Sequence, residues 1–110
     1  MYKDITFEEI RNNKEIATYI SMADQSLASM GYTDHSFGHV LKCAKVVKDI
    51  LTTFGYSLRE INLGQIAAYM HDIGNSINRV DHGLNGACMA FNILTRLEMN
   101  PKDIALIIAA

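Results

Sequence analysis

The sequence lacks the features that mark membrane and secreted proteins. Its apolar stretches fall well short of the roughly 18 consecutive residues that a membrane span needs. Its first residues, Met-Tyr-Lys-Asp-Ile-Thr, lack the charged-then-apolar pattern of a secretory signal. We therefore expect a cytoplasmic protein that has no membrane partner.

An excess of charge of one sign is also missing. The 10 Lys and Arg residues are nearly balanced by 12 Asp and Glu residues, which gives a net charge of −2 and a pI near 6.0. This balance provides no basic surface for nucleic acid, so we expect no nucleic-acid partner. An anionic substrate would need local help from a metal ion or from a few cations.

Cysteine is scarce. Cys43 and Cys88 form neither a CxxC pair nor a larger framework, and with no secretory signal this favours a reducing compartment. We expect two small buried thiols rather than a disulfide. Cys43 lies one helical turn beyond His39, so a mixed His/Cys zinc site is the alternative reading of that position.

Length and composition describe one ordinary globular domain. The 110 residues suffice for one modest core, and 49% hydrophobic with 20% charged residues exclude a disordered chain. No repeat, low-complexity stretch or linker divides the sequence, so residues 1–110 are expected to form a single domain. The last apolar segment stops at Ala110 without a cap or a polar tail, which predicts a domain truncated at its C-terminus.

Helix signals recur along the chain, whereas strand signals are nearly absent. Capping boxes begin at Thr6 and Ser57, and Asn13, Asp81 and Asn100 are placed as N-caps. Apolar residues at helical spacing and the short connections predict an all-α fold, an antiparallel helical bundle. The expected helices are a short one after Thr6, followed by 14–30, 37–51, 58–70, 81–97 and 101–110.

Helical geometry brings the histidines together. From His39 the third helix rises roughly 22 Å to Phe54 at 1.5 Å per residue, and an antiparallel fourth helix returns the chain to the same level at His71. The fifth helix begins beside that end with His82, and His35 lies one turn before His39. All four histidines are therefore expected at one end of the bundle.

His71 and Asp72 form an adjacent imidazole–carboxylate pair at the end of an apolar helical segment, just before Gly74. Neutral imidazole and carboxylate together make a mixed nitrogen–oxygen site for divalent metals. Taken singly, a histidine near a helix start is more often a surface or capping residue. A carboxylate at a helix C-terminus is electrostatically unfavourable, which argues against a merely terminal role for Asp72.

Two segments, 34–44 and 68–74, resemble the HD-domain superfamily of metal-dependent phosphohydrolases. The first carries His39 before an apolar helical run, and the second carries the His71-Asp72 doublet. The resemblance covers roughly residues 33–110. It implies an HD-domain-like bundle in which His39, His71 and Asp72 bind a divalent metal ion (Mn, Fe, Ni, Co, Zn or Mg).

The fourth ligand of the family is an Asp on a helix downstream of the doublet. No residue here matches it, because Asp81 is too close to the doublet and Asp103 begins a helix. The resemblance therefore implies that this Asp lies beyond residue 110. Catalysis by residues 1–110 alone is expected to be crippled.

The resemblance implies hydrolysis of a nucleotide or another small phosphate ester. Asp72 would orient the attacking water, and His35 and His82 would hold or protonate the leaving group. Arg79 and His82 would contact the substrate phosphate. Many members have Lys after the glycine of the doublet, where this chain has Asn75. A contact between that Lys and the phosphate is therefore not expected here, whereas metal binding still is.

Two other readings stay open. The chain could be a non-catalytic HD-like module that binds a nucleotide or a metal for regulation. It could also be a plain helical interaction domain whose histidines are incidental. The apolar face of the last helix would in addition allow a homodimer.

Overall fold

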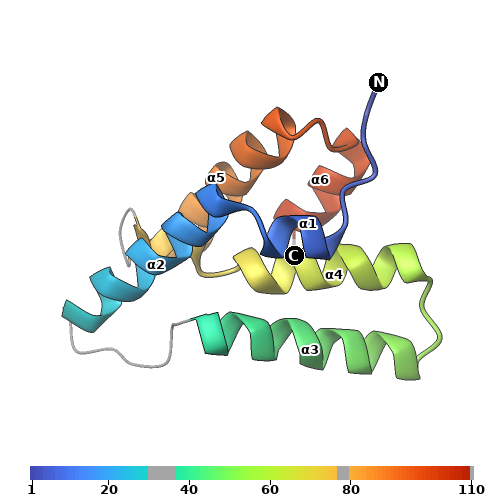
Figure 1. Ribbon diagram of the computed structural model, residues 1–110, viewed down its shortest axis with the longest axis horizontal. Helices are drawn as coiled ribbons and strands as arrows, with labels where there is room; N and C mark the ends of the chain where they lie inside the picture. Colours follow the sequence, from blue (N-terminus) through green and yellow to red (C-terminus); the bar gives the residue numbers. More distant parts are fainter. Residues whose placement is uncertain (30–36, 77–79, 110) are drawn as a thin grey trace.

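The computed structural model describes residues 1–29, 37–76 and 80–109. In this part of the chain the structure is helical and has no strand, apart from an isolated bridge between Lys3 and Met99. The predicted all-α fold is therefore confirmed (Figure 1). The elements are α1 (Phe7–Arg11), α2 (Lys14–Ser29), α3 (Phe37–Thr53), α4 (Leu58–Met70), the 3₁₀ helix η1 (Ile73–Ser76), α5 (His82–Arg96) and α6 (Pro101–Ile108).

Helices α3 and α4 form the antiparallel pair on which the candidate site depends (Figure 1). Gly55 makes the turn between them with φ +79°, a conformation that glycine adopts without strain. A Cβ on Gly64 would lie 2.9 Å from a methyl carbon of Leu51, so this glycine lets the two helices pack closely. The pairing returns the end of α4 to the start of α3, as the sequence predicted.

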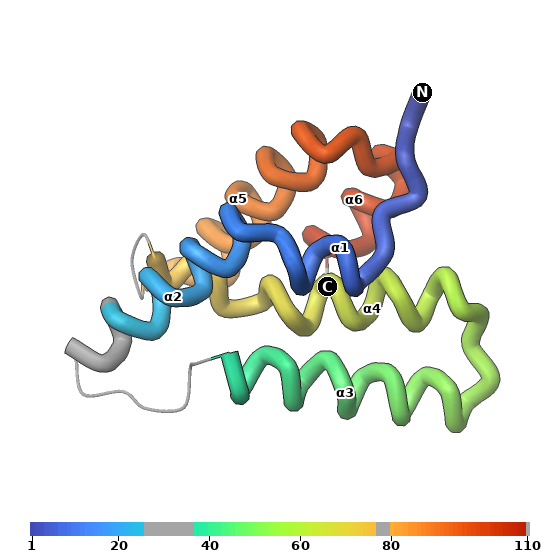
Figure 2. The backbone as a smooth tube through the Cα atoms, viewed as in Figure 1, coloured from blue at the N-terminus to red at the C-terminus, as the bar shows by residue number. Residues whose placement is uncertain are grey.

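Helix α4 lies at the centre of the fold and contributes the largest share of the core. Its buried side chains include Ile66 and Tyr69, and the Tyr69 ring packs edge-on against Phe7 of α1. The tube view in Figure 2 shows α1 lying over α4, with α3 alongside. The core is completed by apolar side chains from the other elements, among them Ile10, Ile16, Ile20, Ile73, Ile93, Leu94 and Ile104.

Most of the predicted helix caps are present. Thr6 accepts a hydrogen bond from the Glu9 amide, Asn13 accepts from Ile16, and Asn100 accepts from Lys102. Ser57 and Glu60 form a complete, reciprocal capping box. Each cap satisfies a backbone amide that the helix leaves without a partner.

Asp81 departs from its predicted role as a side-chain cap. It does precede α5, but its backbone is left-handed (φ 57°) and its side chain makes no capping hydrogen bond. Asp is one of the few non-glycine residues that tolerate this conformation. The segment before it, predicted as a plain loop from Ile73 to Val80, begins with the 3₁₀ helix η1.

The prediction of two buried thiols is wrong. Cys43 is only half-buried and Cys88 is exposed, and both are free. Cys88 lines a surface hollow together with Tyr19 of α2 and Arg96 of α5, whereas Sγ of Cys43 lies 3.8 Å from Nε2 of His39 on α3. The two thiols therefore have very different surroundings.

A side-chain amide fastens the N-terminal segment to α4. Asn62 accepts a hydrogen bond from the Phe7 amide at 2.6 Å and donates one to the Ile5 carbonyl at 2.9 Å. These two bonds fix the position of α1 on the central helix. No sequence pattern indicates this role for Asn62.

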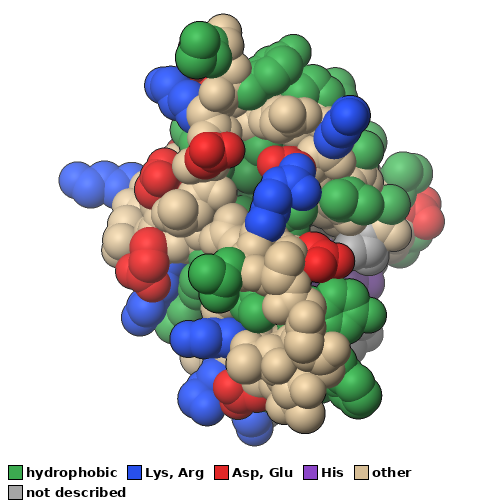
Figure 3. All heavy atoms as spheres, turned by 90° about the vertical axis from the view of Figure 1, so that its right-hand side faces the viewer, with side chains coloured by type: hydrophobic (Ala, Val, Ile, Leu, Met, Phe, Trp, Pro, Cys, Tyr) green, Lys and Arg blue, Asp and Glu red, His purple; other side chains and the backbone are tan. Residues whose placement is uncertain are grey.

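The surface carries no large field of one sign on the face that Figure 3 presents, where basic and acidic side chains are interspersed. No helix in the described ranges is long and apolar enough to cross a membrane. Several large apolar side chains are exposed, including Phe54, Leu84 and, on α6, Leu106.

The ion pair between Glu15 of α2 and Arg96 of α5 predicts a pH effect on stability. Arg96 donates two hydrogen bonds to the Glu15 carboxylate, at 2.9 and 2.5 Å, and these bonds lower the pKa of Glu15. A lowered pKa in the folded state adds stability above the unfolded pKa, and this stability is lost as the pH falls through the folded value. We expect Arg96→Gln to remove the loss of stability at acidic pH and to lower the stability at neutral pH only slightly, as is usual for exposed pairs.

Urea denaturation of the Arg96→Gln variant and the parent chain between neutral pH and pH 3.5 tests this prediction. The difference in unfolding free energy should shrink as the pH falls. A difference that is constant over this range would show that the pair does not contribute through the ionised Glu15.

Candidate metal centre

The His71-Asp72 doublet lies where α4 ends. Met70 is the last residue of α4, and His71 follows as its C-cap with φ −63° and ψ −28°. Asn75 then donates two hydrogen bonds to the Asp72 carbonyl oxygen, one from its backbone amide and one from its side chain, each 3.0 Å long. This clamp fixes the tight turn in which Asp72 points inward.

The Asp72 carboxylate faces three imidazoles, which come from α3, from the C-cap of α4 and from α5. Its Oδ2 lies 3.1 Å from Nε2 of His71 and 3.8 Å from Nε2 of His39. Its Oδ1 lies 3.5 Å from Nε2 of His82. The Asp72 side chain is only 12% exposed, so the carboxylate is largely withdrawn from solvent. The two rings of His39 and His71 are tilted, with centroids 5.5 Å apart.

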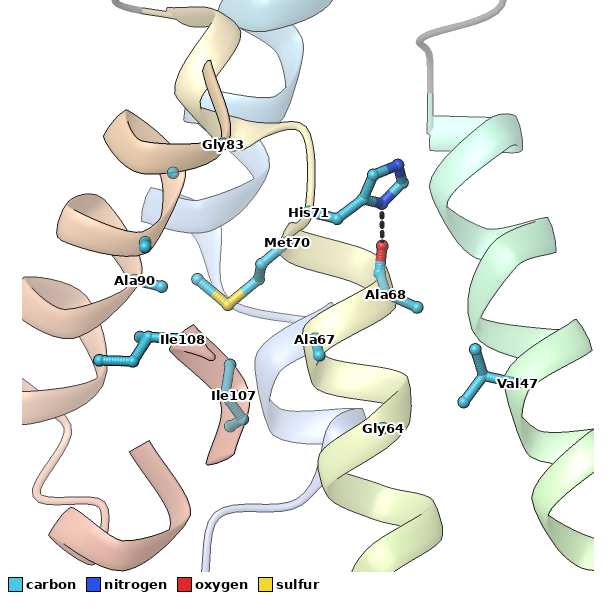
Figure 4. Close-up of a pocket in the computed structure, with 12 residues that line it drawn as sticks. Val47, Gly64, Ala67, Ala68, Met70, His71, Gly83, Ala90, Ile107 and Ile108 are labelled. Carbon is cyan, nitrogen blue, oxygen red and sulfur yellow. Dashed lines mark hydrogen bonds between the residues drawn. The ribbon is translucent and has the colours of Figure 1, made fainter. Parts of the chain in front are cut away.

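The ring of His71 is oriented from behind by a backbone carbonyl. Nδ1 of His71 lies 2.5 Å from the Ala68 carbonyl oxygen, shown as the dashed line in Figure 4. A carbonyl can only accept, so Nδ1 carries the hydrogen and Nε2 is left to face Asp72. Metal-binding histidines are commonly oriented in this way by a hydrogen bond on the far nitrogen.

Electrostatics at His71 follow from this arrangement. The hydrogen bond to Asp72 raises the pKa of His71, partial burial opposes the rise, and the Ala68 carbonyl adds to it. The site therefore attracts positive charge to the Nε2 side of the ring. A proton or a divalent cation would satisfy that preference.

Gly74 allows the start of α5 to come close to the doublet. A Cβ on Gly74 would lie 1.9 Å from the His82 carbonyl oxygen and 2.4 Å from the Gly86 amide nitrogen. Only glycine fits this contact between η1 and α5. The close approach places the His82 ring against the second oxygen of Asp72.

Cys43 completes the inner wall of the site from α3. Its Sγ lies 3.8 Å from Nε2 of His39, one turn earlier on the same helix. The donor atoms of His39, Cys43 and His71 all lie within 4.8 Å of one another. The His/Cys alternative that the sequence raised at this position is therefore consistent with the geometry.

The donor set suits a divalent metal. With bond lengths of about 2.0–2.1 Å, tetrahedral coordination places a nitrogen and an oxygen ligand about 3.4 Å apart. The His71–Asp72 and His39–Asp72 distances of 3.1 and 3.8 Å bracket this value. Asp72 thus lies at distances from His39 and from His71 that one ion could bridge with small side-chain movements.

The other predicted site residues have different outcomes. His35 and Arg79 lie outside the described residues. Asn75 is fully buried and its amide bonds the Asp72 backbone, so it stabilises the turn. Asp103 pairs with Arg59 at the other end of α4, in agreement with its exclusion as a ligand.

A cavity of about 400 Å³ adjoins the site over the face of α4. Small residues such as Gly64, Ala67 and Ala87 form much of its wall, Ile107 and Ile108 of α6 close one side, and His71 lies at its edge. Figure 4 shows His71 pointing toward α3, with Met70 and the α6 residues on the other side of α4. The cavity is thus apolar and has one polar end.

Comparison with known proteins finds a relative in an archaeon. The chain is 31% identical to the uncharacterized protein MJ1020 of Methanocaldococcus jannaschii, in an alignment that covers 83% of this chain and 41% of the relative. The chain thus spans about two fifths of the length of the curated relative that it matches. No family model matches the chain, and no solved structure matches it significantly.

Proposed function

We propose that the chain is the metal-binding part of a phosphohydrolase that acts on a nucleotide or another small phosphate ester. A divalent ion would be held by His39, His71 and Asp72. The observation that carries the proposal is the Asp72 carboxylate, which is 12% exposed and faces imidazoles from α3, α4 and α5. Imidazole and carboxylate side chains together are a common set of metal ligands.

A bound divalent ion would lower the pKa of a coordinated water and stabilise charge on the phosphoryl oxygens. The chain's own residues would do the rest. His71 is held by Ala68 so that Nε2 faces the centre. Asp72 would orient the attacking water, and Nε2 of His82, beside Asp72 Oδ1, would hold a proton for the leaving oxygen.

The residues outside the described part keep their proposed roles. His35 would assist the leaving group, and Arg79 would contact the phosphate as a planar, permanently charged donor. The apolar cavity beside His71 would accept the uncharged part of the ester. Its volume suits a small organic group rather than a polymer.

Hydrolysis assays with and without metal test the proposal. The metal-depleted chain would be assayed against a phosphomonoester, a phosphodiester and a cyclic nucleotide, with Mn²⁺, Fe²⁺, Ni²⁺ or Zn²⁺ added. We expect weak ester hydrolysis that exceeds the rate of the free metal, is abolished by a chelator and is restored by the ion. His39→Ala should lose this activity, and Lys42→Ala, on the same helix, should keep it.

A non-catalytic regulatory module is the second candidate, and one observation favours it. Many members of the HD-domain superfamily, which the sequence resembles, carry Lys where this chain has Asn75. The Asn75 side chain is fully buried and donates a hydrogen bond to the Asp72 backbone. It offers no cation to a phosphate. Nucleotide binding by the metal-loaded chain with no turnover of any ester would favour this function over the enzyme.

A further inference from the structure

The side chain of Cys43 lies among the proposed metal ligands. Its Sγ is 3.8 Å from Nε2 of His39, and it belongs to the group of three donors whose ligand atoms lie within 4.8 Å of one another. Both residues project from one face of α3, because they are four residues apart. The thiol is half-buried and its sulfur lies beside the His39 ring.

The measured separation agrees with shared coordination. With a metal–sulfur bond of about 2.3 Å and a metal–nitrogen bond of about 2.0–2.1 Å, a tetrahedral angle places sulfur and nitrogen about 3.6 Å apart. The observed 3.8 Å differs from this by less than the movement of one side-chain rotamer. Asp72 Oδ2 approaches the same His39 nitrogen, also at 3.8 Å. The Cys43 sulfur and the Asp72 carboxylate therefore both lie near Nε2 of His39, the nitrogen that would bind the metal.

We propose that Cys43 binds the metal as a thiolate, together with His39 and His71, and that this ligand makes the centre selective for zinc over magnesium and manganese. The inference rests on the metal site of the proposed function and names the ion that the site prefers. On binding, the sulfur–hydrogen bond breaks and a sulfur–metal bond forms, while the proton passes to solvent. No change in oxidation state is involved.

The chemistry of the donors gives the selectivity. Thiolate is a soft ligand that favours zinc and related ions, whereas magnesium and manganese prefer carboxylate, carbonyl and water. Zinc accepts a mixed set of nitrogen, sulfur and oxygen donors and can expand to five ligands. A zinc ion bound by the Cys43 thiolate could therefore still accept a water or a substrate oxygen as a further ligand.

Cobalt(II) spectroscopy tests the proposal without reference to turnover. Cobalt(II) occupies zinc sites, and a bound thiolate gives a strong near-ultraviolet charge-transfer band. The reduced chain, its Cys43→Ser variant and its Cys88→Ser variant would be titrated with Co²⁺ and then with Zn²⁺ as competitor. Cys88 is the matched control, because it is the other free thiol and is exposed on α5.

We expect the band in the parent chain and in Cys88→Ser, and its loss in Cys43→Ser. The zinc affinity of Cys43→Ser should fall more than about tenfold, since even partners outside the coordination shell typically contribute 10–100-fold. Manganese affinity should change much less. Circular dichroism would establish that each variant remains folded.

The opposite results separate this inference from the proposed function. If the parent chain binds Co²⁺ without a thiolate band, or if Cys43→Ser keeps both the band and the zinc affinity, the thiolate ligand is disproved while the His/Asp site stands. If the parent chain binds neither Co²⁺ nor Zn²⁺, the inference and the metal site both fail.

Discussion

Replacement of Asp72 by Asn is expected to weaken metal binding at the candidate centre severely and to abolish any hydrolysis. The Asp72 carboxylate faces His39 and His71 through one oxygen and His82 through the other. Asn keeps the size and shape of the side chain but removes the negative charge that three imidazoles surround. We expect metal affinity to fall by roughly a hundredfold or more, above the 10–100-fold typical of residues that only support a ligand.

Asp49→Asn is the matched control for this change. Asp49 lies on α3, is 63% exposed and pairs with Lys45. Its substitution therefore removes one negative charge without changing the candidate metal centre. Isothermal titration with Zn²⁺ and Mn²⁺, followed by the ester assay, would compare the two variants with the parent chain. Unchanged metal affinity in a folded Asp72→Asn variant would contradict the assignment of Asp72 as a ligand.

Replacement of Gly74 by Ala is expected to destabilise the fold and to separate His82 from Asp72. The added methyl would lie 1.9 Å from the His82 carbonyl and 2.4 Å from the Gly86 amide. Both contacts are with backbone atoms, so no side-chain rotation can relieve them. Overpacking of this kind typically costs 1–3 kcal/mol, and we expect a loss near the upper end, about 3 kcal/mol.

Gly83→Ala provides a control in the first turn of α5. A Cβ at Gly83 would meet no atom within 4 Å, and alanine in a helix is favoured over glycine by about 1 kcal/mol. This variant should therefore be as stable as the parent chain or slightly more stable. Urea denaturation measures both variants, and equal stabilities for Gly74→Ala and Gly83→Ala would show that η1 and α5 do not meet as closely as the structure indicates.

The bundle and the meeting of α3 with α4 were predictable because local chemistry determines them. Asn13, Ser57 and Asn100 cap helices through bonds with residues two or three positions away, which the sequence displays directly. The level of His71 relative to His39 follows from helix rise and a short turn alone. These predictions required no knowledge of contacts between distant segments.

The finer features of the site depend on contacts that a sequence does not display. The left-handed backbone of Asp81 and the close approach of Gly74 to α5 arise from packing between η1 and α5. From the sequence, Asn75 is notable only because it replaces the Lys of the family. In the structure its buried side-chain amide donates a hydrogen bond to the Asp72 carbonyl. Cys43 had a visible signal, its four-residue spacing from His39, but burial could not be judged without the neighbouring helix.

The metal content of the purified chain beside its His71→Ala variant tests the central claim most directly. Each protein would be incubated with Zn²⁺, Mn²⁺, Fe²⁺ or Ni²⁺, desalted and analysed for bound metal. We predict about one transition-metal ion per parent chain and a large loss in the variant, because His71 would supply one of the nitrogen atoms that hold the ion. Equal metal content in both proteins, or none in either, would contradict it.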